Sequence, residues 1–307
     1  MPAQAAAALK STDRFAKLEN KRYLFMNNLL TFDIEGFRDA LHESISIPPR
    51  AKPNFSEKDV IETNTMEILS LLSECSAKGT FFILGWIAKE MPSLIQTIAS
   101  EGHEIACHGL LHKRLFNLSR REIEESLTEA KKCLEDASGS AVYGFRAPDF
   151  SIIKSNLWVH DILQGLEFTY DSSIFPISFH DVYGMKNIPR SPFKLPNGLI
   201  EIPLSTVRFI KNIPFGGGGY FRLYPFFLTK LFLTIVNRQG TPGVFYLHPY
   251  EIGKVVPALE GMDLLRTFRT YYGVKKAKTK LKKLLVNFEF TTAAEYVRTK
   301  WGSGLIC

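Results

Sequence analysis

The sequence predicts an α/β fold in which parallel strands are joined by crossover helices. Short apolar segments alternate along the chain with segments of helical periodicity. This alternation is typical of βαβ units, because a parallel partner strand can be reached only through a long connection. We find no internal repeat and no flexible linker, so we expect one domain.

The strand and helix segments follow one another in order. Each expected strand is a short apolar run bounded by polar or turn residues. These runs cover residues 29–32, 80–84, 104–107, 142–145, 168–170, 199–203, 244–247 and 288–291. The clearest helices cover residues 64–75, 93–101, 119–135 and 156–164. The third of them opens with Ser119 and Glu122 at the spacing of a capping box.

Length and composition are those of an ordinary globular protein, with 307 residues, 45% of them hydrophobic and 22% charged. No apolar run approaches the roughly 18 residues of a membrane span, and the start of the chain lacks a secretory pattern. The four cysteines have no Cys-x-x-Cys spacing, which suits a reducing compartment. We therefore expect a cytoplasmic protein with a helical or disordered N-terminal extension (1–25) and a catalytic domain (26–307).

Six lysines of an amphipathic helix carry much of the net charge of +7. They are Lys275, Lys276, Lys278, Lys280, Lys282 and Lys283. One interpretation is a solvated helix packed on the core, and the other is attraction to an anionic partner, such as the inner face of a membrane. No nucleic-acid-binding motif accompanies the charge, so we expect no nucleic-acid partner.

Two histidines four residues apart, His108 and His112, follow the apolar run at 104–107. If a helix begins here, both imidazoles project from one face, where they can bind one metal ion such as zinc. A catalytic zinc site needs a third protein ligand and an open position for water. On spacing alone, two solvated or capping histidines are the alternative.

Ionisable residues follow the ends of several expected strands. In α/β barrels the active site is built at the carboxyl ends of the strands. The residues placed there are Asp33, Glu35, His108, His112, Arg146, Asp149, Asp171 and His248. Asp33 and Glu35 alternate along an extended backbone, so both would point to the same face, where one could bind metal and the other contact water. The alternative for this pair is an N-cap or a surface acidic pair; the whole set indicates a metal-dependent hydrolase.

Six ordered segments resemble the motifs of NodB-type polysaccharide deacetylases. They are Thr31-Phe-Asp33-Ile-Glu35, Thr80-Phe-Phe-Ile-Leu-Gly85-Trp86, the segment from Gly102 to His112, Gly144-Phe-Arg146-Ala-Pro148, the segment from Tyr170 to Pro176, and Phe245-Tyr-Leu-His248-Pro. The resemblance covers residues 27–298 and is strongest to the branch associated with exopolysaccharide and exosortase gene clusters. It implies a distorted (β/α) barrel and a zinc-dependent N-deacetylase.

The resemblance also implies roles for the site residues. The metal ligands would be Glu35, His108 and His112. Asp33 would be the general base and His248 the general acid for the departing amine. Arg146 would orient Asp33.

Two aspartates later in the chain are implied as well. The backbone N–H of Asp149 would stabilise the oxyanion. Its negative side chain, unusual for the family, could select a cationic or hydroxyl-rich substrate or slow the reaction. Asp171 would hold and tune His248, or shape the end of the fifth strand. Glu35 stands where many relatives have aspartate.

Further substrate contacts are expected around the glycine run 216–219. It lacks the sequence of a P-loop, so a turned or flexible loop is the expectation. Tyr220 and Phe221 could stack on sugar rings, and Arg222 could meet phosphate. Leu247 could wall the acetyl methyl group.

The expected function is removal of an N-acetyl group from an amino sugar, with release of acetate. The substrate could be nucleotide-linked, lipid-linked or an oligosaccharide, in exopolysaccharide biosynthesis. The alternatives are an O-acetyl esterase, a deformylase or another amidohydrolase, and a carbohydrate-binding homologue without turnover.

Overall fold

The computed structural model describes residues 26–41, 55–178, 184–259, 262–302, 304 and 306. The expected N-terminal extension, 1–25, lies outside the described residues. Among the described helices, none has both the length and the apolar character needed to cross a bilayer.

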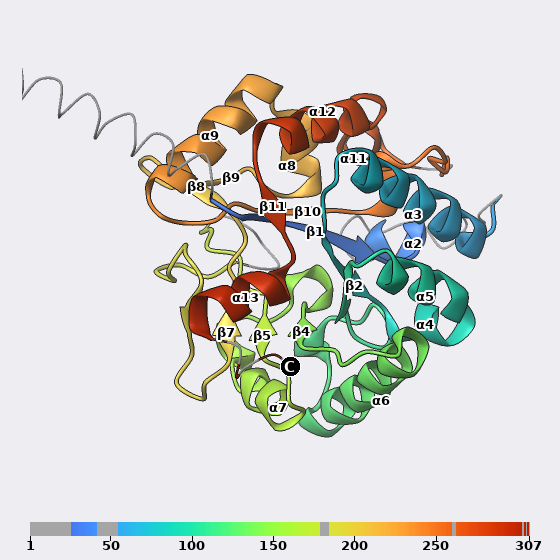
Figure 1. Ribbon diagram of the computed structural model, residues 1–307, viewed down its shortest axis with the longest axis vertical. Helices are drawn as coiled ribbons and strands as arrows, with labels where there is room; N and C mark the ends of the chain where they lie inside the picture. Colours follow the sequence, from blue (N-terminus) through green and yellow to red (C-terminus); the bar gives the residue numbers. More distant parts are fainter. Residues whose placement is uncertain are drawn as a thin grey trace, which may run out of the picture.

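A curled, mainly parallel sheet forms the centre of the fold (Figure 1). Its strands are β1 (Asn28–Ile34), β2 (Thr80–Ile83), β3 (Glu104–Cys107), β4 (Gly144–Phe145), β5 (Tyr170–Asp171), β6 (Phe193–Lys194), β7 (Ile200–Glu201), β10 (Val244–Leu247) and β11 (Phe290–Thr291). The order is β10-β1-β2-β3-β4-β5-β7-β6, with β11 also paired to β1. The β6–β7 pair is antiparallel and the other pairs are parallel. The expected α/β fold with a distorted barrel is confirmed.

Helices surround this sheet, and most of them lie on its outer face (Figure 1). They are α2 (Phe37–Leu41), α3 (Glu57–Glu74), α4 (Gly85–Glu90), α5 (Pro92–Ser100), α6 (Arg120–Ser138), α7 (Val159–Gly165), α8 (Gly218–Leu223), α9 (Phe226–Arg238), α10 (Pro249–Ile252), α11 (Leu264–Tyr271), α12 (Val274–Asn287) and α13 (Ala293–Trp301). A separate hairpin is formed by β8 (Thr206–Arg208) and β9 (Asn212–Pro214). The capping box of Ser119 and Glu122 is present at the start of α6.

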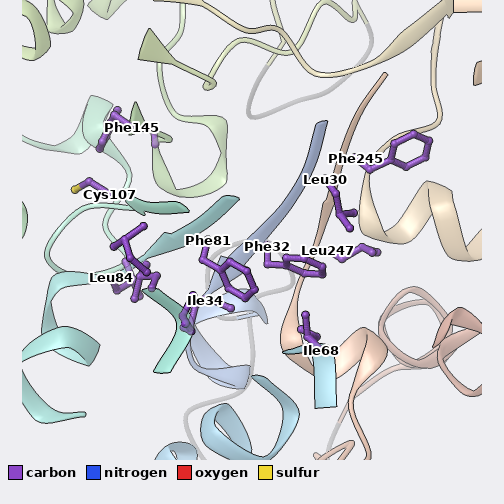
Figure 2. Packing of buried hydrophobic residues seen from close by; sticks show 14 of the residues in the cluster. Leu30, Phe32, Ile34, Ile68, Phe81, Leu84, Cys107, Phe145, Phe245 and Leu247 are labelled. Atoms are coloured by element: carbon purple, nitrogen blue, oxygen red, sulfur yellow. The ribbon is translucent and has the colours of Figure 1, made fainter. Parts of the chain in front are cut away.

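Strand β1 lies between β2 and β10 and is buried along its whole length. Leu30, Phe32 and Ile34 point to the outer face, where they pack under helices such as α3 (Figure 2). Because side chains alternate along a strand, Asp33 lies on the opposite, inner face. The strand is buried on both faces, and its buried polar residues Asn28, Thr31 and Asp33 all have hydrogen-bond partners.

The interior of the half-barrel is filled by a second apolar cluster, which includes Phe82, Tyr170 and Tyr246. Helix α13 closes the amino ends of the strands, where the N–H of Ala293 donates to Thr80 Oγ1. The carboxyl ends of the strands stay accessible at the other side. A ligand can therefore reach the functional side chains on the inner face of β1 only from that end.

The basic helix α12 is largely committed to the fold. Lys278 pairs with Glu67, Lys282 Nζ lies 2.8 Å from Glu74 Oε2, and Lys280 donates to the carbonyl of Tyr224 at 2.5 Å. Burial lowers the pKa of Lys280 to about 8. Half of the six lysines therefore have partners within the described fold.

Candidate active site

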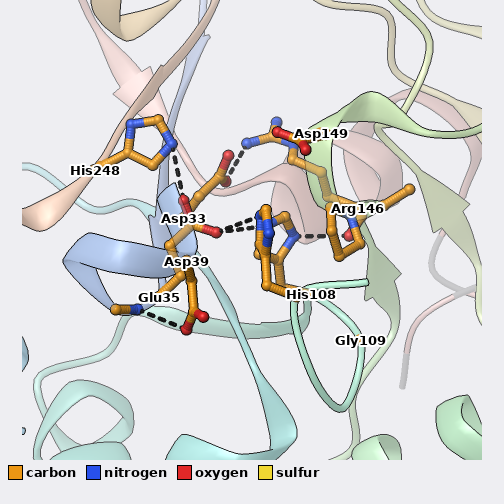
Figure 3. Close-up of polar contacts among 12 residues, drawn as sticks. Asp33, Glu35, Asp39, His108, Gly109, Arg146, Asp149 and His248 are labelled. Carbon is orange, nitrogen blue, oxygen red and sulfur yellow. Dashed lines mark hydrogen bonds and ion pairs between the residues drawn. The ribbon is translucent and has the colours of Figure 1, made fainter. Parts of the chain in front are cut away.

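Three predicted metal ligands meet at the carboxyl ends of β1 and β3 (Figure 3). Glu35 Oε2 lies 2.8 Å from His112 Nε2 and 3.4 Å from His108 Nε2. Neither contact has the alignment of a hydrogen bond, so this buried oxygen has no hydrogen-bond partner among the described residues. Ligand atoms that face one shared point are expected to have this arrangement.

The tautomer of His108 suits a metal ligand. Its Nδ1 lies 2.8 Å from the carbonyl oxygen of Arg146, to which it can donate a proton only as the Nδ1–H form. This contact leaves the lone pair of Nε2 directed at Glu35 and His112. Such a carbonyl partner is the usual means by which a protein orients a ligating imidazole.

The loop between the two histidines is a bend and not the helix considered from the spacing. Gly109 adopts a positive φ of 89°, which a residue with a side chain rarely does. This turn brings the two imidazoles to a centroid distance of 5.7 Å. The pairing of His108 with His112 therefore depends on a glycine turn.

Charge around Glu35 is shared among three imidazoles. Burial would raise the pKa of Glu35, but His112, His108 and His248 outweigh it and hold the pKa well below its usual range. Burial opposes protonation of His112, but Glu35 raises its pKa to about 9. The cluster thus concentrates a carboxylate and imidazole nitrogens at one buried point, and a divalent cation could replace the protons.

Asp33 is held by a fully buried arginine (Figure 3). Arg146 Nη1 donates to Asp33 Oδ1 and to Thr31 Oγ1, each at 2.7 Å. The rest of the guanidinium bonds to the carbonyl and hydroxyl oxygens of Ser172 and lies 4.1 Å above the ring of Phe82. This arrangement neutralises the charge of Asp33 and leaves its carboxylate with one orientation.

His248 lies on the other side of Glu35, with its Nε2 3.2 Å from Glu35 Oε1. Its Nδ1 lies 3.0 Å from Glu251 Oε2, and Glu251 Oε1 accepts from Arg222 Nε at 2.5 Å. Burial opposes the charged imidazole, but Glu251 and Glu35 raise the pKa of His248 well above its ordinary value. The Arg222–Glu251–His248 chain therefore favours a protonated imidazole. It was not anticipated.

The expectation that Asp171 holds His248 is wrong. Asp171 Oδ2 lies 3.1 Å from His160 Nε2, and Asp171 Oδ1 accepts from Ser173 Oγ at 2.5 Å. His160 and Asp171 form a second buried cluster with Glu201. Burial, followed by the charge of Asp171, raises the pKa of Glu201 well above its usual range. Asp171 does mark the end of the fifth strand, as the other expectation had it.

Two expected substrate contacts, Phe221 and Leu247, do not reach the cavity, and a third, Arg222, lines it with a guanidinium whose hydrogen bonds go to the fold. Arg222 is buried and donates to Glu251 and to the carbonyl oxygens of Arg269, Thr270 and Tyr272. Phe221 packs edge-on against a core phenylalanine, and Leu247 is fully buried. Neither faces the cavity.

The glycine run is closely packed and is not a phosphate loop. A Cβ on Gly217 would lie 2.4 Å from the ring of Tyr246, and one on Gly218 would lie 2.1 Å from Glu251 Oε2. The absence of a side chain at Gly218 thus allows the start of α8 to lie close to the carboxylate of Glu251, which holds His248. Tyr220, one turn later, lines the cavity as expected.

Asp149 also lines the cavity. Its backbone is left-handed, with φ 50° and ψ 26°, within a short 3-10 turn, Pro148–Phe150. Its carboxylate accepts from Arg114 Nε at 2.8 Å. Arg114 therefore balances the negative charge that was expected to act on the substrate or on Arg146.

A cavity of about 670 Å³ lies over these residues. Asp33, Glu35, His108, His112 and His248 line its base. Its outer wall includes aromatic and apolar residues of α8 and α11, namely Tyr220, Leu223, Leu265, Phe268 and Tyr272. A sugar residue would fit a cavity of this size, whose polar groups are gathered at one end.

Comparisons with known proteins agree with this arrangement. Residues 54–164 match the polysaccharide deacetylase model, and residues 172–298 match a domain of unknown function, DUF3473. A chitooligosaccharide deacetylase of Sinorhizobium fredii is 35% identical over 32% of this chain and 44% of its own. A peptidoglycan-N-acetylglucosamine deacetylase of Bacillus cereus is 31% identical over 30% and 34%. The chain thus spans less than half the length of these relatives.

Two solved structures share the fold over most of the chain. One from Mycobacterium smegmatis, named as a polysaccharide deacetylase, is 21% identical, with a TM-score of 0.59 over 89% of this chain and 90% of its own. Puue allantoinase is 18% identical, with a TM-score of 0.57 over the same shares. Residues 54–164 are therefore similar in sequence to polysaccharide deacetylases, and the fold over most of the chain is the one that these solved structures share.

Proposed function

We propose that this protein is a metal-dependent carbohydrate N-deacetylase, which hydrolyses the acetamide of an N-acetylated amino sugar and releases acetate. The observation that carries the proposal is the position of Asp33 and His248 beside the Glu35–His108–His112 cluster. A hydrolase needs a base and an acid close to one electrophilic centre, and this cavity supplies both.

The cluster fits a divalent metal, most simply zinc. Two imidazole nitrogens and one carboxylate oxygen are a donor set used by catalytic zinc sites. The buried Glu35 Oε2, without a hydrogen-bond partner among the described residues, supports such a use. Zinc bound there would polarise the acetamide carbonyl and favour ionisation of a water.

The residues of the chain would then handle the protons and the developing charge. Asp33, fixed by Arg146, accepts a proton from the attacking water while the water oxygen bonds to the acetyl carbon. The N–H of Asp149 donates to the oxyanion that forms. His248 gives its proton to the amide nitrogen as the C–N bond breaks, leaving acetate and a free amine.

The names of the curated relatives support an amino-sugar substrate, since both refer to acetylated amino sugars. We propose that the amino sugar is carried by an oligosaccharide, a nucleotide or a lipid-linked glycan. A cytoplasmic location, a place in exopolysaccharide biosynthesis and membership of the exopolysaccharide-associated branch stay predictions.

Acetate release from N-acetylated chitooligosaccharides, with and without added zinc, tests the proposal. We expect zinc-dependent release that disappears in Asp33→Asn and His108→Ala. Release that persists in both variants would refute the assigned roles. O-acetylated and formylated sugars run in parallel identify the bond, and turnover of those substrates alone would replace the N-deacetylase by an esterase or a deformylase.

A further inference from the structure

The apolar side of helix α11 is exposed, with Leu265 and Phe268 in the wall of the cavity and Leu264 outside it. Leu264, Leu265 and Phe268 are all exposed, Leu264 at 91%, and Tyr272 follows on the same side. Among the residues of this helix, Thr270 is the one that is buried. An amphipathic helix of a globular protein normally buries its apolar side, so this orientation indicates a second contact.

The exposed apolar residues continue on neighbouring elements. Leu223, at the end of α8, lines the same cavity wall as Leu265 and Phe268, and Arg222 ties α8 to the α11 backbone. Phe227 and Leu231 follow on α9, and both are exposed. Of these residues, Leu223, Leu265 and Phe268 line the active-site cavity.

The β8–β9 hairpin adds an apolar tip next to α9. Ile210 at the tip is 95% exposed, and Phe209 is 55% exposed while its ring contacts Phe232 of α9 at 6.1 Å between centroids. Arg208 and Lys211 flank this pair on either side. We call Phe209, Ile210, Leu223, Phe227, Leu231, Leu264, Leu265, Phe268 and Tyr272 the docking surface.

Basic residues outnumber acidic ones in the segments that carry the docking surface, and Asp263, next to Leu264, pairs with Arg266. The sequence has no acidic residue between Glu201 and Glu251, a stretch that contains Arg208, Lys211, Lys230 and Arg238. It has none from Leu264 to Phe288 either, a stretch that contains Arg266, Arg269 and the α12 lysines. Apolar side chains flanked by arginine and lysine match the interface of an anionic bilayer, where the former enter the acyl boundary and the latter meet phosphates.

We propose that the docking surface seats the protein on an anionic phospholipid bilayer, with the active-site cavity opening at its edge. The membrane contact that the sequence placed on α12 thus moves to the docking surface. Lys275 and Lys276 would add attraction to the anionic headgroups. The docked protein would act on amino sugars linked to membrane lipids, a consequence that rests on the proposed function.

Co-sedimentation with vesicles tests the proposal without any need for turnover. Wild-type protein and the turnover variant Asp33→Asn are mixed with vesicles of phosphatidylcholine alone or with one-quarter phosphatidylglycerol. We expect both proteins to bind the anionic vesicles at least tenfold more tightly than the neutral ones. The binding should weaken as salt rises.

Two variants place the contact on the docking surface. Leu264→Glu and Ile210→Glu, which do not line the cavity, should each weaken vesicle binding at least tenfold and leave hydrolysis of a soluble substrate unchanged. Leu157→Glu, an exposed leucine before α7 at the opposite end of Figure 1, is the matched control and should bind like wild type.

Three results would overturn the proposal. One is wild-type protein that binds anionic vesicles no better than neutral ones. Another is vesicle binding that is unchanged in Leu264→Glu and Ile210→Glu but lost in Lys275→Glu, which would place the membrane contact on α12. The third is dimerisation abolished by Leu264→Glu without any vesicle binding, which would make the surface a contact between copies. Since vesicle binding is measured without substrate, its outcome is separate from that of the deacetylase assay.

Discussion

Replacement of Glu251 by glutamine tests how the structure prepares His248 for proton donation. The variant keeps the size of the side chain and one acceptor oxygen but removes the charge that faces His248 Nδ1 at 3.0 Å. Burial would raise the pKa of Glu251, but Arg222 and His248 lower it to about 2, so the native side chain is a carboxylate. Without it, the pKa of His248 falls.

The size of the effect follows from one lost charge-assisted hydrogen bond, about 1.5–3 kcal/mol. At about 1.4 kcal/mol per factor of ten, kcat should fall about 10–150-fold. Catalysis needs the protonated imidazole, so activity is lost as the pH rises through its pKa, and this basic limb should move to lower pH in Glu251→Gln. KM and the bound zinc should change little.

The assay is acetate release as a function of pH, with thermal unfolding measured on the same samples. Glu201→Gln is the matched control, because Glu201 is equally buried but belongs to the His160 cluster. It should keep the wild-type pH profile. A Glu251→Gln enzyme with the kcat and pH profile of wild type would refute the positioning role of Glu251.

Three further predictions concern the fold and the site. Arg146→Lys should lower kcat at least tenfold and reduce the free energy of unfolding by about 3 kcal/mol, since Asp33 loses its buried partner. Acetate release measures kcat and urea denaturation measures the free energy of unfolding. Wild-type values in both assays would contradict this prediction. Burial, followed by the charge of Lys78, lowers the pKa of His103 from 6.5 to about 4, so the free energy of unfolding is highest above pH 6.5 and falls by about 3 kcal/mol as the pH falls to 4. His103→Gln should flatten that pH dependence in urea titrations, and an unchanged slope would exclude it. Gly218→Ala should lower kcat, because the new methyl group displaces the Glu251 carboxylate, whereas Gly219→Ala, which meets nothing within 4 Å, should behave like wild type.

Local patterns predicted the central strands and the residues at their ends. The expected bounds of β3 and β10 agree with the structure, since both are short apolar runs with clear turns around them. Alternation along β1 placed Asp33 and Glu35 on one face, and the sheet order then brought His108 and His248 beside them. The strand pattern therefore predicted which residues stand at the strand ends, whereas the sheet order that brings them together came from the structure and their roles came from the family resemblance.

Other features depend on contacts between distant segments, which periodicity does not report. No sequence pattern singled out Glu251, and its role arises because α8 brings Arg222 against it. Asp171 follows a strand end as the other site residues do, but His160 on α7 occupies its carboxylate. The outward side of α11 is equally invisible from its sequence, because an amphipathic pattern does not say which side faces the core.

Anomalous X-ray diffraction at the zinc edge, on crystals grown with one equivalent of zinc, tests the central claim most directly. We predict one strong peak within bonding distance of Glu35 Oε2, His108 Nε2 and His112 Nε2, in protein that releases acetate. A peak confined to the His160–Asp171–Glu201 cluster, or none at Glu35 in protein that is fully active, would contradict the proposed metal site.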